Sequence, residues 1–242
     1  MQHGGWRCTA ILLVLCPRAL AGSTGAPPQF LVFDDDASLG LDFVAAARQE
    51  AANLTVIGRG TDDWGSAAVL RSLAVHQPAC NRIALSDACK ALLGLTRFDA
   101  VFDFSATSGD DVKAVNAVVK TAHYVLASSA AVYSPSVFER PFVEVYVPGR
   151  SSWRNVLMRT EQLALEDTLL QAAADGGFCA TVLRLPSVLG RRDSSNRLAQ
   201  LLLMLEMDDV PLSSAGHAAL VSFVGPPSVA SAALRIVRRV GA

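Results

Sequence analysis

The stretch FLVFDDDASLGLDFVAAARQEAANLTVI, residues 30–57, carries the pattern that decides the fold. It opens with a short apolar run at residues 30–33 and continues with apolar residues at helical spacing over residues 39–52. A second apolar run follows at residues 54–57. A strand, a helix and a strand of these lengths are typical of a βαβ unit, in which the two strands lie parallel. The stretch therefore predicts a parallel sheet with a helix packed on it.

The same alternation continues toward the C-terminus. Apolar runs predict strands at residues 98–104, 124–127 and 180–185. Helical spacing predicts helices at residues 87–93, 110–120, 152–174, 196–207 and 227–240. Ser86 can cap the first of these helices, and the acidic pair Asp110 and Asp111 favours the start of the second. We therefore expect an α/β fold, a Rossmann-like doubly wound parallel sheet, with a reduced C-terminal lobe at residues 190–224.

Composition limits the class of protein. Of the 242 residues, 51% are hydrophobic and 18% are charged, so the chain can bury a large core and is not intrinsically disordered. The formal net charge of -1 argues against nucleic acid as a partner, because phosphate backbones bind basic surfaces. No apolar run approaches the roughly 18 residues of a membrane-spanning helix. A small nucleotide or a protein partner remains open, as does the oligomeric state.

Residues 1–21 have the features of a secretory signal in the expected order. Arg7 supplies positive charge, residues 8–16 form a short apolar core, and Ala19-Leu20-Ala21 resembles a cleavage site. We therefore expect a cleavable leader at 1–21, a linker at 22–28 and one domain at 29–242. The destination would be the endoplasmic reticulum, the exterior or an organelle reached through the secretory pathway. The alternative is a cytoplasmic protein with a misplaced start codon or an unstructured extension.

The cysteines do not indicate a disulfide framework. Cleavage after Ala21 would leave Cys80, Cys89 and Cys179, which is an odd number. Cys80 and Cys89 could pair with each other, but we expect buried free thiols at both positions.

The turn after the first strand is a poor match to a dinucleotide-binding turn. Such a turn needs glycines where the backbone approaches the pyrophosphate, and here Asp34 and Ala37 hold the first two glycine positions while Gly40 keeps the third. We interpret Asp34 to Asp36 as an acidic cap on the helix that starts near Leu39, in preference to a metal site. After the second strand, Arg59 could meet the 2′-phosphate of NADP or be a surface arginine.

Four later segments share a family pattern. They are the strand and turn at residues 98–106, S-S-x-x-V-Y at residues 128–133, L-R-x-x-x-V-x-G at residues 183–190, and the pairs Phe223-Val224 and Val229-Ala230. In this order they resemble the extended short-chain dehydrogenase/reductase family, also called the NAD-dependent epimerase/dehydratase family. The resemblance spans residues 29–240 and implies a Rossmann-like domain that binds NAD or NADP.

The resemblance also implies a catalytic serine, tyrosine and lysine. Ser129 matches the serine, which orients the substrate oxygen. Glu161 matches a helix glutamate of the family, and counting back from it places Trp153 at the tyrosine and Leu157 at the lysine. An indole does not exchange a proton at useful pH and leucine carries no charge. The candidate cofactor contacts are Gly40, Arg59 and Ser105, weak or absent NAD(P) binding is expected, and no metal site is predicted.

Other polar residues offer weaker alternatives. Tyr146 and Arg150 have the tyrosine–lysine spacing but lie in a Pro-Gly segment that suits a loop, and Tyr133 fits a packed aromatic. We expect His123 and His217 to be isolated surface or packed residues. Arg184, together with Arg191 and Arg192, is expected on the surface or between elements.

Three hypotheses for function follow. The first is a divergent member of the family that lacks the tyrosine–lysine pair and acts as a weak nucleotide-binding or interaction protein. The second is an active NAD(P)-dependent oxidoreductase or epimerase, acting on a nucleotide-sugar or a similar carbonyl or hydroxyl substrate with Ser129 and a displaced acid. The third is an RNA-associated relative of the family, which the charge balance disfavours.

Overall fold

The structure is a computed structural model of the 242-residue chain. It describes residues 11–16, 26–34, 39–58, 65–73, 75–78, 80, 85–132, 153–190 and 223–240, together with the single positions 199, 202, 203 and 206. Most of the predicted helix at 196–207 and of the predicted lobe at 190–224 lies outside these residues.

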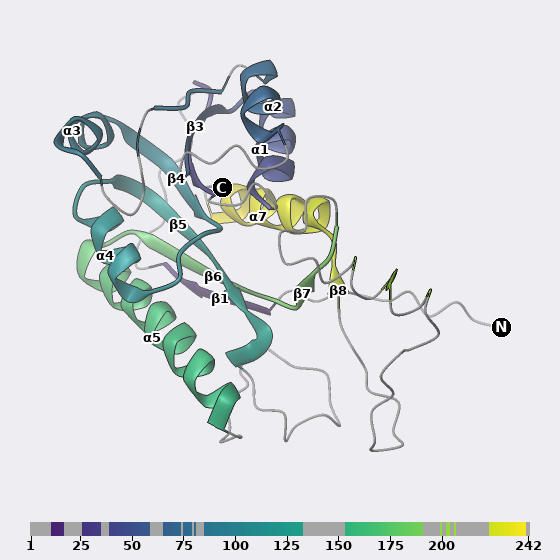
Figure 1. The fold of residues 1–242 in the computed structure, drawn as a ribbon. Coiled ribbons are helices and arrows are strands. Elements are labelled where there is room, and N and C mark those ends of the chain that lie inside the picture. The colour runs from purple at the N-terminus through teal and green to yellow at the C-terminus, as the bar shows by residue number, and fades with distance from the viewer. Residues whose placement is uncertain are drawn as a thin grey trace.

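Six strands form one sheet in the order β1-β6-β5-β4-β2-β3 (Figure 1). The strands are β1 Ile11–Leu15, β2 Gln29–Phe33, β3 Asn53–Ile57, β4 Arg97–Asp103, β5 Lys120–Ser129 and β6 Cys179–Leu185. Strands β2 to β6 are parallel, which confirms the predicted parallel sheet. Strand β1 runs antiparallel to β6 at one edge, and it lies in the segment that the sequence pattern predicts as a leader.

Helices cover both faces of this sheet. They are α1 Gly40–Gln49, α2 Ser66–Ser72, α3 Asp87–Leu95, α4 Gly109–Asn116, α5 Trp153–Gly176 and α7 Pro226–Val240. Helix α7 packs on α1 on one side of the sheet, and α4 packs on α5 on the other (Figure 1). This arrangement confirms the Rossmann-like doubly wound fold.

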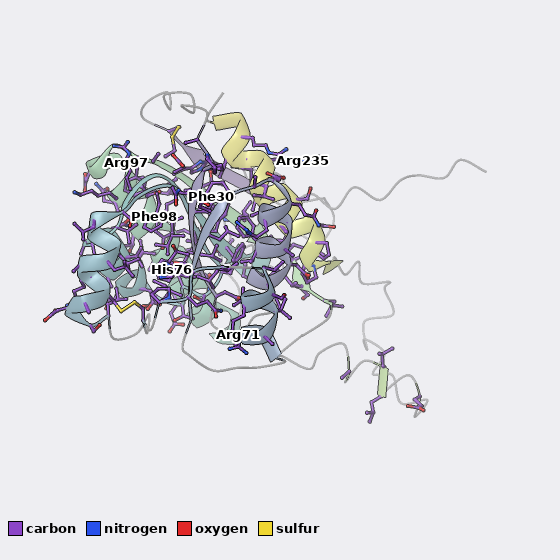
Figure 2. The ribbon with its side chains drawn as sticks, turned by 90° about the horizontal axis from the view of Figure 1, so that it is seen from above. Phe30, Arg71, His76, Arg97, Phe98 and Arg235 are labelled. Carbon is purple, nitrogen blue, oxygen red and sulfur yellow. A yellow bond between two sulfur atoms is a disulfide. The ribbon has the colours of Figure 1, made fainter. Side chains whose placement is uncertain are left out.

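The core consists of two apolar layers separated by the sheet. Alternate residues of each strand point to opposite faces, so Val32 belongs to the layer under α1 and α7, whereas Leu31 belongs to the layer under α4 and α5. The rings of Phe43 and Phe102, whose centroids are 4.1 Å apart, join α1 to β4. In Figure 2 the buried Phe30 and Phe98 lie among the packed side chains, while Arg71 and Arg235 lie at the periphery.

Two small elements complete the described chain. Strands β7 (Ser187–Val188) and β8 (Phe223–Val224) form a separate parallel pair that leads into α7. A short 3-10 helix, η2 (Ala130–Val132), follows β5. No helix among the described residues is both long and apolar enough to cross a membrane.

Element boundaries were predicted less well than the elements themselves. The predicted helix at residues 110–120 is too long, because α4 ends at Asn116 and Lys120 already belongs to β5. Ser86 does cap α3, since its hydroxyl accepts a hydrogen bond from the Cys89 backbone N–H at 3.3 Å. Helix α2 was not predicted.

The cysteine prediction is wrong. Cys80 is joined by a disulfide to Cys89, and Cys16 is joined to Cys179. Counting only the cysteines after residue 21 hid the second pairing, because its first cysteine lies in the predicted leader.

Candidate functional site

The strand order reverses direction between β2 and β4, and the candidate site lies at this point. Strand β2 pairs with β3 on one side and with β4 on the other, although β3 and β4 are not neighbours. In doubly wound sheets ligands bind outside the carboxyl ends of the strands at such a switch point. The residues that follow here are Asp34 after β2 and Phe104 after β4, whose backbone N–H bonds the carbonyl oxygen of Phe33 at 3.0 Å.

Asp34 fills the space at the start of α1. A Cβ atom added to Gly40, the first residue of the helix, would overlap the Asp34 carboxylate. A Cβ atom on Gly58, at the end of β3, would lie 2.7 Å from the carbonyl oxygen of Asp34. The backbone N–H of Asp34 also bonds the carbonyl oxygen of Ile57 at 3.1 Å. The two glycines therefore make room for Asp34 of this chain.

The acidic-cap interpretation of the turn is confirmed only in its position. Helix α1 begins at Gly40, and the Asp34 carboxylate lies beside that residue. However, the N-cap residue is Leu39, which supplies no side-chain hydrogen bond. Asp35, Asp36 and Ala37 lie outside the described residues.

A second carboxylate organises the turn after β4. Asp103 is completely buried, and its Oδ1 accepts hydrogen bonds from the backbone N–H groups of Ser105 at 3.1 Å and Ala106 at 2.9 Å. Its Oδ2 accepts a hydrogen bond from the hydroxyl of the buried Tyr124. Neither residue was predicted as a site residue, since an acid at the end of an apolar run is typical of a turn and an aromatic residue within a strand is typical of a core. The turn is held in place by the chain's own acid.

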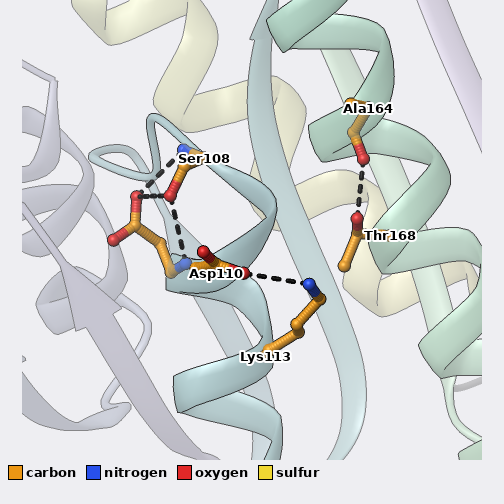
Figure 3. A network of polar contacts seen from close by, with 6 residues as sticks. Ser108, Asp110, Lys113, Ala164 and Thr168 are labelled. Atoms are coloured by element: carbon orange, nitrogen blue, oxygen red, sulfur yellow. Dashed lines mark hydrogen bonds and ion pairs between the residues drawn. The ribbon is translucent and has the colours of Figure 1, made fainter.

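A third carboxylate occupies the start of α4. Asp111 Oδ2 accepts hydrogen bonds from the backbone N–H groups of Thr107 and Ser108, both at 2.9 Å. The Ser108 hydroxyl in turn accepts from the Asp111 N–H at 3.3 Å, which completes a capping box (Figure 3). An ion pair between Lys113 and Asp110 at 2.9 Å follows on the exposed side of the same helix.

These contacts place carboxylates of the chain itself around the switch point. A bound phosphate is held by backbone N–H groups at the start of α1 and by close approach to a glycine-rich turn. In this structure the Asp34 carboxylate lies against Gly40, the first residue of α1, and residues 35–38 of the turn lie outside the described residues. Within the described residues, no group of three or more His, Cys, Asp or Glu side chains is arranged to hold a metal ion.

Two of the three candidate cofactor residues, Gly40 and Ser105, lie in the described part of the structure. Gly40 is the first residue of α1, and the Asp34 carboxylate lies where a Cβ atom of this residue would be. The backbone of Ser105 is used by Asp103, and Ser105 lies in the turn after β4. Arg59 lies outside the described residues.

Ser129, the candidate catalytic serine, is the last residue of β5 and is half-buried. Its strand pairs in register with Leu185 of β6, which packs in the layer under α1 and α7. Trp153 is the first residue of α5, and Leu157 lies one turn further along the helix. The side chains of both residues are outside the described part of the structure. Tyr133, Tyr146 and Arg150 lie outside the described residues altogether. The structure therefore places the serine at the carboxyl edge and leaves its relation to Trp153 a prediction.

A buried charged network lies one residue before Ser129, on the opposite face of β5. Glu166 of α5 accepts hydrogen bonds from Arg184 of β6, with Nη2 to Oε2 at 2.6 Å and Nε to both carboxylate oxygens at 3.1 Å. The Ser128 hydroxyl donates to Glu166 Oε1 at 2.5 Å and lies 3.3 Å from Gln162 Oε1. Arg184 is an inter-element contact, as expected, but it is buried and not a surface residue. The signal for this network was an acid within the apolar stripe of α5.

His123 is packed in the core rather than exposed. Its Nε2 lies 2.8 Å from the hydroxyl oxygen of Thr181, while its Nδ1 has no hydrogen-bond partner among the described residues. Burial lowers the pKa of His123 to about 4, because the charged imidazolium loses its hydration. His123 is therefore neutral at physiological pH. It is completely buried, so its imidazole does not reach a ligand at the carboxyl edge of the sheet. His217 lies outside the described residues.

A polar groove of about 460 Å³ runs between α1 and α7, away from the switch point. Asp42, Glu50, Arg235 and Arg238 contribute its charged groups, and Glu50 and Arg238 form an ion pair across it. The charges of both signs are thus largely balanced within the groove.

Comparisons with known proteins agree on the fold. No family model and no curated protein matches the sequence. Solved structures do match: UDP-glucose 4-epimerase from Thermotoga maritima has a TM-score of 0.67 at 16% identity, covering 85% of this chain and 72% of that one. The enzyme WbmH from Bordetella bronchiseptica, solved in complex with NAD+, has a TM-score of 0.62 at 15% identity, covering 88% and 73%.

A third match is UDP-N-acetylglucosamine 4-epimerase from Bacillus cereus, with a TM-score of 0.59 at 14% identity, covering 88% of this chain and 74% of that one. The chain therefore has the fold of these epimerases. This confirms, at the level of the fold, the resemblance carried by the sequence segments at residues 98–106, 128–133 and 183–190.

Proposed function

We propose that this chain is a divergent Rossmann-fold protein of the epimerase/dehydratase type that binds NAD(P) weakly or not at all and acts as a binding or interaction protein. The observation that carries the proposal is the Asp34 carboxylate against Gly40 at the start of α1. WbmH, one of the matching structures, was solved in complex with NAD+, so a dinucleotide is the ligand to test first.

Electrostatics supports weak binding. A carboxylate about 4 Å from a phosphate opposes binding by roughly 4 kcal/mol at an effective dielectric constant near 20, before screening by solvent and salt. Asp34 is partly exposed, so the real penalty is smaller. Even about 1.4 kcal/mol is a tenfold loss of affinity.

Loss of the catalytic pair is the second part of the proposal. Trp153 and Leu157 stand where the family has tyrosine and lysine. With neither a titrating hydroxyl nor a cation at these positions, the chain's own residues would leave Ser129 without a proton-transfer partner. No epimerase or dehydrogenase turnover is then expected.

Titration calorimetry with NAD+, NADH and NADP+ tests the first part. The wild-type protein should give dissociation constants of about 1 mM or weaker, and Asp34→Gly, which removes both charge and bulk, should bind at least about tenfold more tightly. Asp34→Asn should gain less, because it keeps the bulk. Asp42→Asn is the matched control, since it removes a carboxylate from the first turn of the same helix without touching Gly40. Low-micromolar binding by the wild-type protein would contradict the proposal.

The second candidate is an active NAD(P)-dependent oxidoreductase or epimerase, and the position of Ser129 at the carboxyl end of β5 favours it. This candidate predicts turnover of a nucleotide-sugar that Ser129→Ala abolishes. Turnover that survives Ser129→Ala, or no turnover in either protein, would reject it.

We further propose that the protein enters the secretory pathway, because disulfides such as Cys80–Cys89 persist in oxidising compartments. Expression with a C-terminal reporter and protease protection of isolated microsomes tests this. Degradation of the reporter without detergent would contradict it.

A further inference from the structure

The N-terminal strand closes one edge of the sheet. Strand β1 lies antiparallel to β6, in a register that runs from Ile11 opposite Arg184 to Leu15 opposite Ala180. Every residue of β6 is buried. Without β1, strand β6 would be the edge strand of the sheet, and its backbone N–H and C=O groups on that side would be unpaired. Such an edge can pair with a strand of another chain.

A disulfide holds the strand at its C-terminal end. Cys16 follows β1 directly, and it is bonded to Cys179, the first residue of β6. The bond joins positions separated by 163 residues, so it ties the start of the chain to the far side of the fold. Cys16 is exposed whereas Cys179 is buried, so a reductant in solution reaches the disulfide from the Cys16 side.

We propose that the Cys16–Cys179 disulfide is a redox latch, which keeps the N-terminal strand on β6 and whose opening lets a second copy of the chain pair through the same edge. Opening consumes one dithiol: its two thiols become a cyclic disulfide, and Cys16 and Cys179 each take up one proton and one electron. The proposal concerns the chain that keeps residues 1–21, because a chain cleaved after Ala21 has neither β1 nor Cys16.

A second copy is the occupant that the strand geometry favours. Strand β1 shows that this edge of β6 accepts an antiparallel partner. A twofold axis perpendicular to the strands relates two β6 strands in antiparallel orientation, so self-pairing about such an axis reproduces the geometry that β1 provides within one chain. Strand β3 forms the other edge of the sheet, and there the backbone of His76 already bonds Leu54 and Val56 of β3.

The experiment uses the full chain under oxidising and reducing conditions. Peptide mapping without reduction should recover a Cys16–Cys179 cross-link. Light scattering should then give a monomer for the oxidised protein, and a dimer fraction that increases with protein concentration after addition of a dithiol or in Cys16→Ser. The Leu13→Pro/Cys16→Ser variant, in which β1 can no longer pair regularly, should be dimeric under both conditions.

A matched control separates the two disulfides. Cys80→Ser/Cys89→Ser removes the other bond and should remain monomeric when oxidised and dimerise when reduced. Hydrogen exchange should show the β6 amides exchanging at least about tenfold faster in reduced monomers than in oxidised ones. A protein that stays monomeric on reduction and in Leu13→Pro/Cys16→Ser would overturn the proposal, as would the absence of the Cys16–Cys179 cross-link. Circular dichroism confirms that each variant is folded; if the double variant is unfolded, the reduced wild-type protein and Cys16→Ser decide the outcome.

Discussion

Arg184 donates hydrogen bonds to both carboxylate oxygens of Glu166 in the interior of the molecule. Arg184 belongs to strand β6 of the sheet, and Glu166 belongs to helix α5, which packs on the sheet. The guanidinium is 6% exposed and the carboxylate 2%, so neither charge is hydrated. Removing one partner leaves the other buried and uncompensated, which costs far more than the pair itself contributes.

Glu166→Ala should therefore lower the free energy of unfolding by about 3–5 kcal/mol. Urea denaturation measures this. Glu161→Ala, on the exposed side of the same helix, is the control and should change stability by no more than about 0.5 kcal/mol. Equal effects of the two substitutions would show that the pair is solvated in solution.

The neighbouring serines should behave differently. Ser128 donates its hydroxyl hydrogen toward Glu166, so Ser128→Ala should cost about 1–3 kcal/mol. Ser129 is half-buried at the strand end, and Ser129→Ala should cost no more than about 1 kcal/mol. Thermal unfolding of the two variants shows which substitution lowers stability more. A larger loss of stability in Ser129→Ala than in Ser128→Ala would mean that the strand register is wrong.

Stability should fall in mild acid because of His123. Its pKa is lowered from 6.5 to about 4 in the folded protein, so between these values the unfolded chain binds more protons. The contribution of His123 to stability is then complete above pH 6.5 and is lost as the pH falls toward 4, by about 3 kcal/mol in total.

The measurement is the slope of unfolding free energy against pH. His123→Leu should flatten the slope between pH 6.5 and 4, whatever its effect on absolute stability. An unchanged slope in His123→Leu would mean that His123 is accessible to protons in the native state.

The hydroxyl of Tyr124 and the carboxylate of Asp103 should be energetically coupled. Both are fully buried, and the contact fixes the turn after β4. Tyr124→Phe should cost about 1.5–3 kcal/mol, because it deprives a buried carboxyl group of a hydrogen-bond donor. A double-mutant cycle with Asp103→Asn should give a coupling energy of at least about 0.5 kcal/mol. Additive effects would show that the two side chains do not interact.

The sequence was sufficient for the parallel sheet because apolar runs and helical spacing alternate clearly between residues 30 and 185. The edge strand β1 was not predicted, since a strand and a signal core are both short apolar runs and only the partner strand distinguishes them. The place of Asp34 was predicted from the missing glycine. Its role beside Gly40 was predicted only in outline, because a cap and a space-filling carboxylate look alike in sequence. The Arg184–Glu166 pair was not predicted, because the two side chains meet only when α5 packs on β6, and no local sequence pattern shows that contact.

The register between β1 and β6 also sets the order in which the molecule can be assembled. The ribosome delivers Ile11 long before Arg184, so the first strand to emerge has no partner until about three-quarters of the chain has been synthesised. Pairings this distant in sequence form slowly, because a long loop must close before any contact is gained. The parallel core is thus expected to fold first during translation, with β1 docking last. Until then the apolar segment Ile11–Leu15 of the nascent chain is accessible to chaperones and targeting factors.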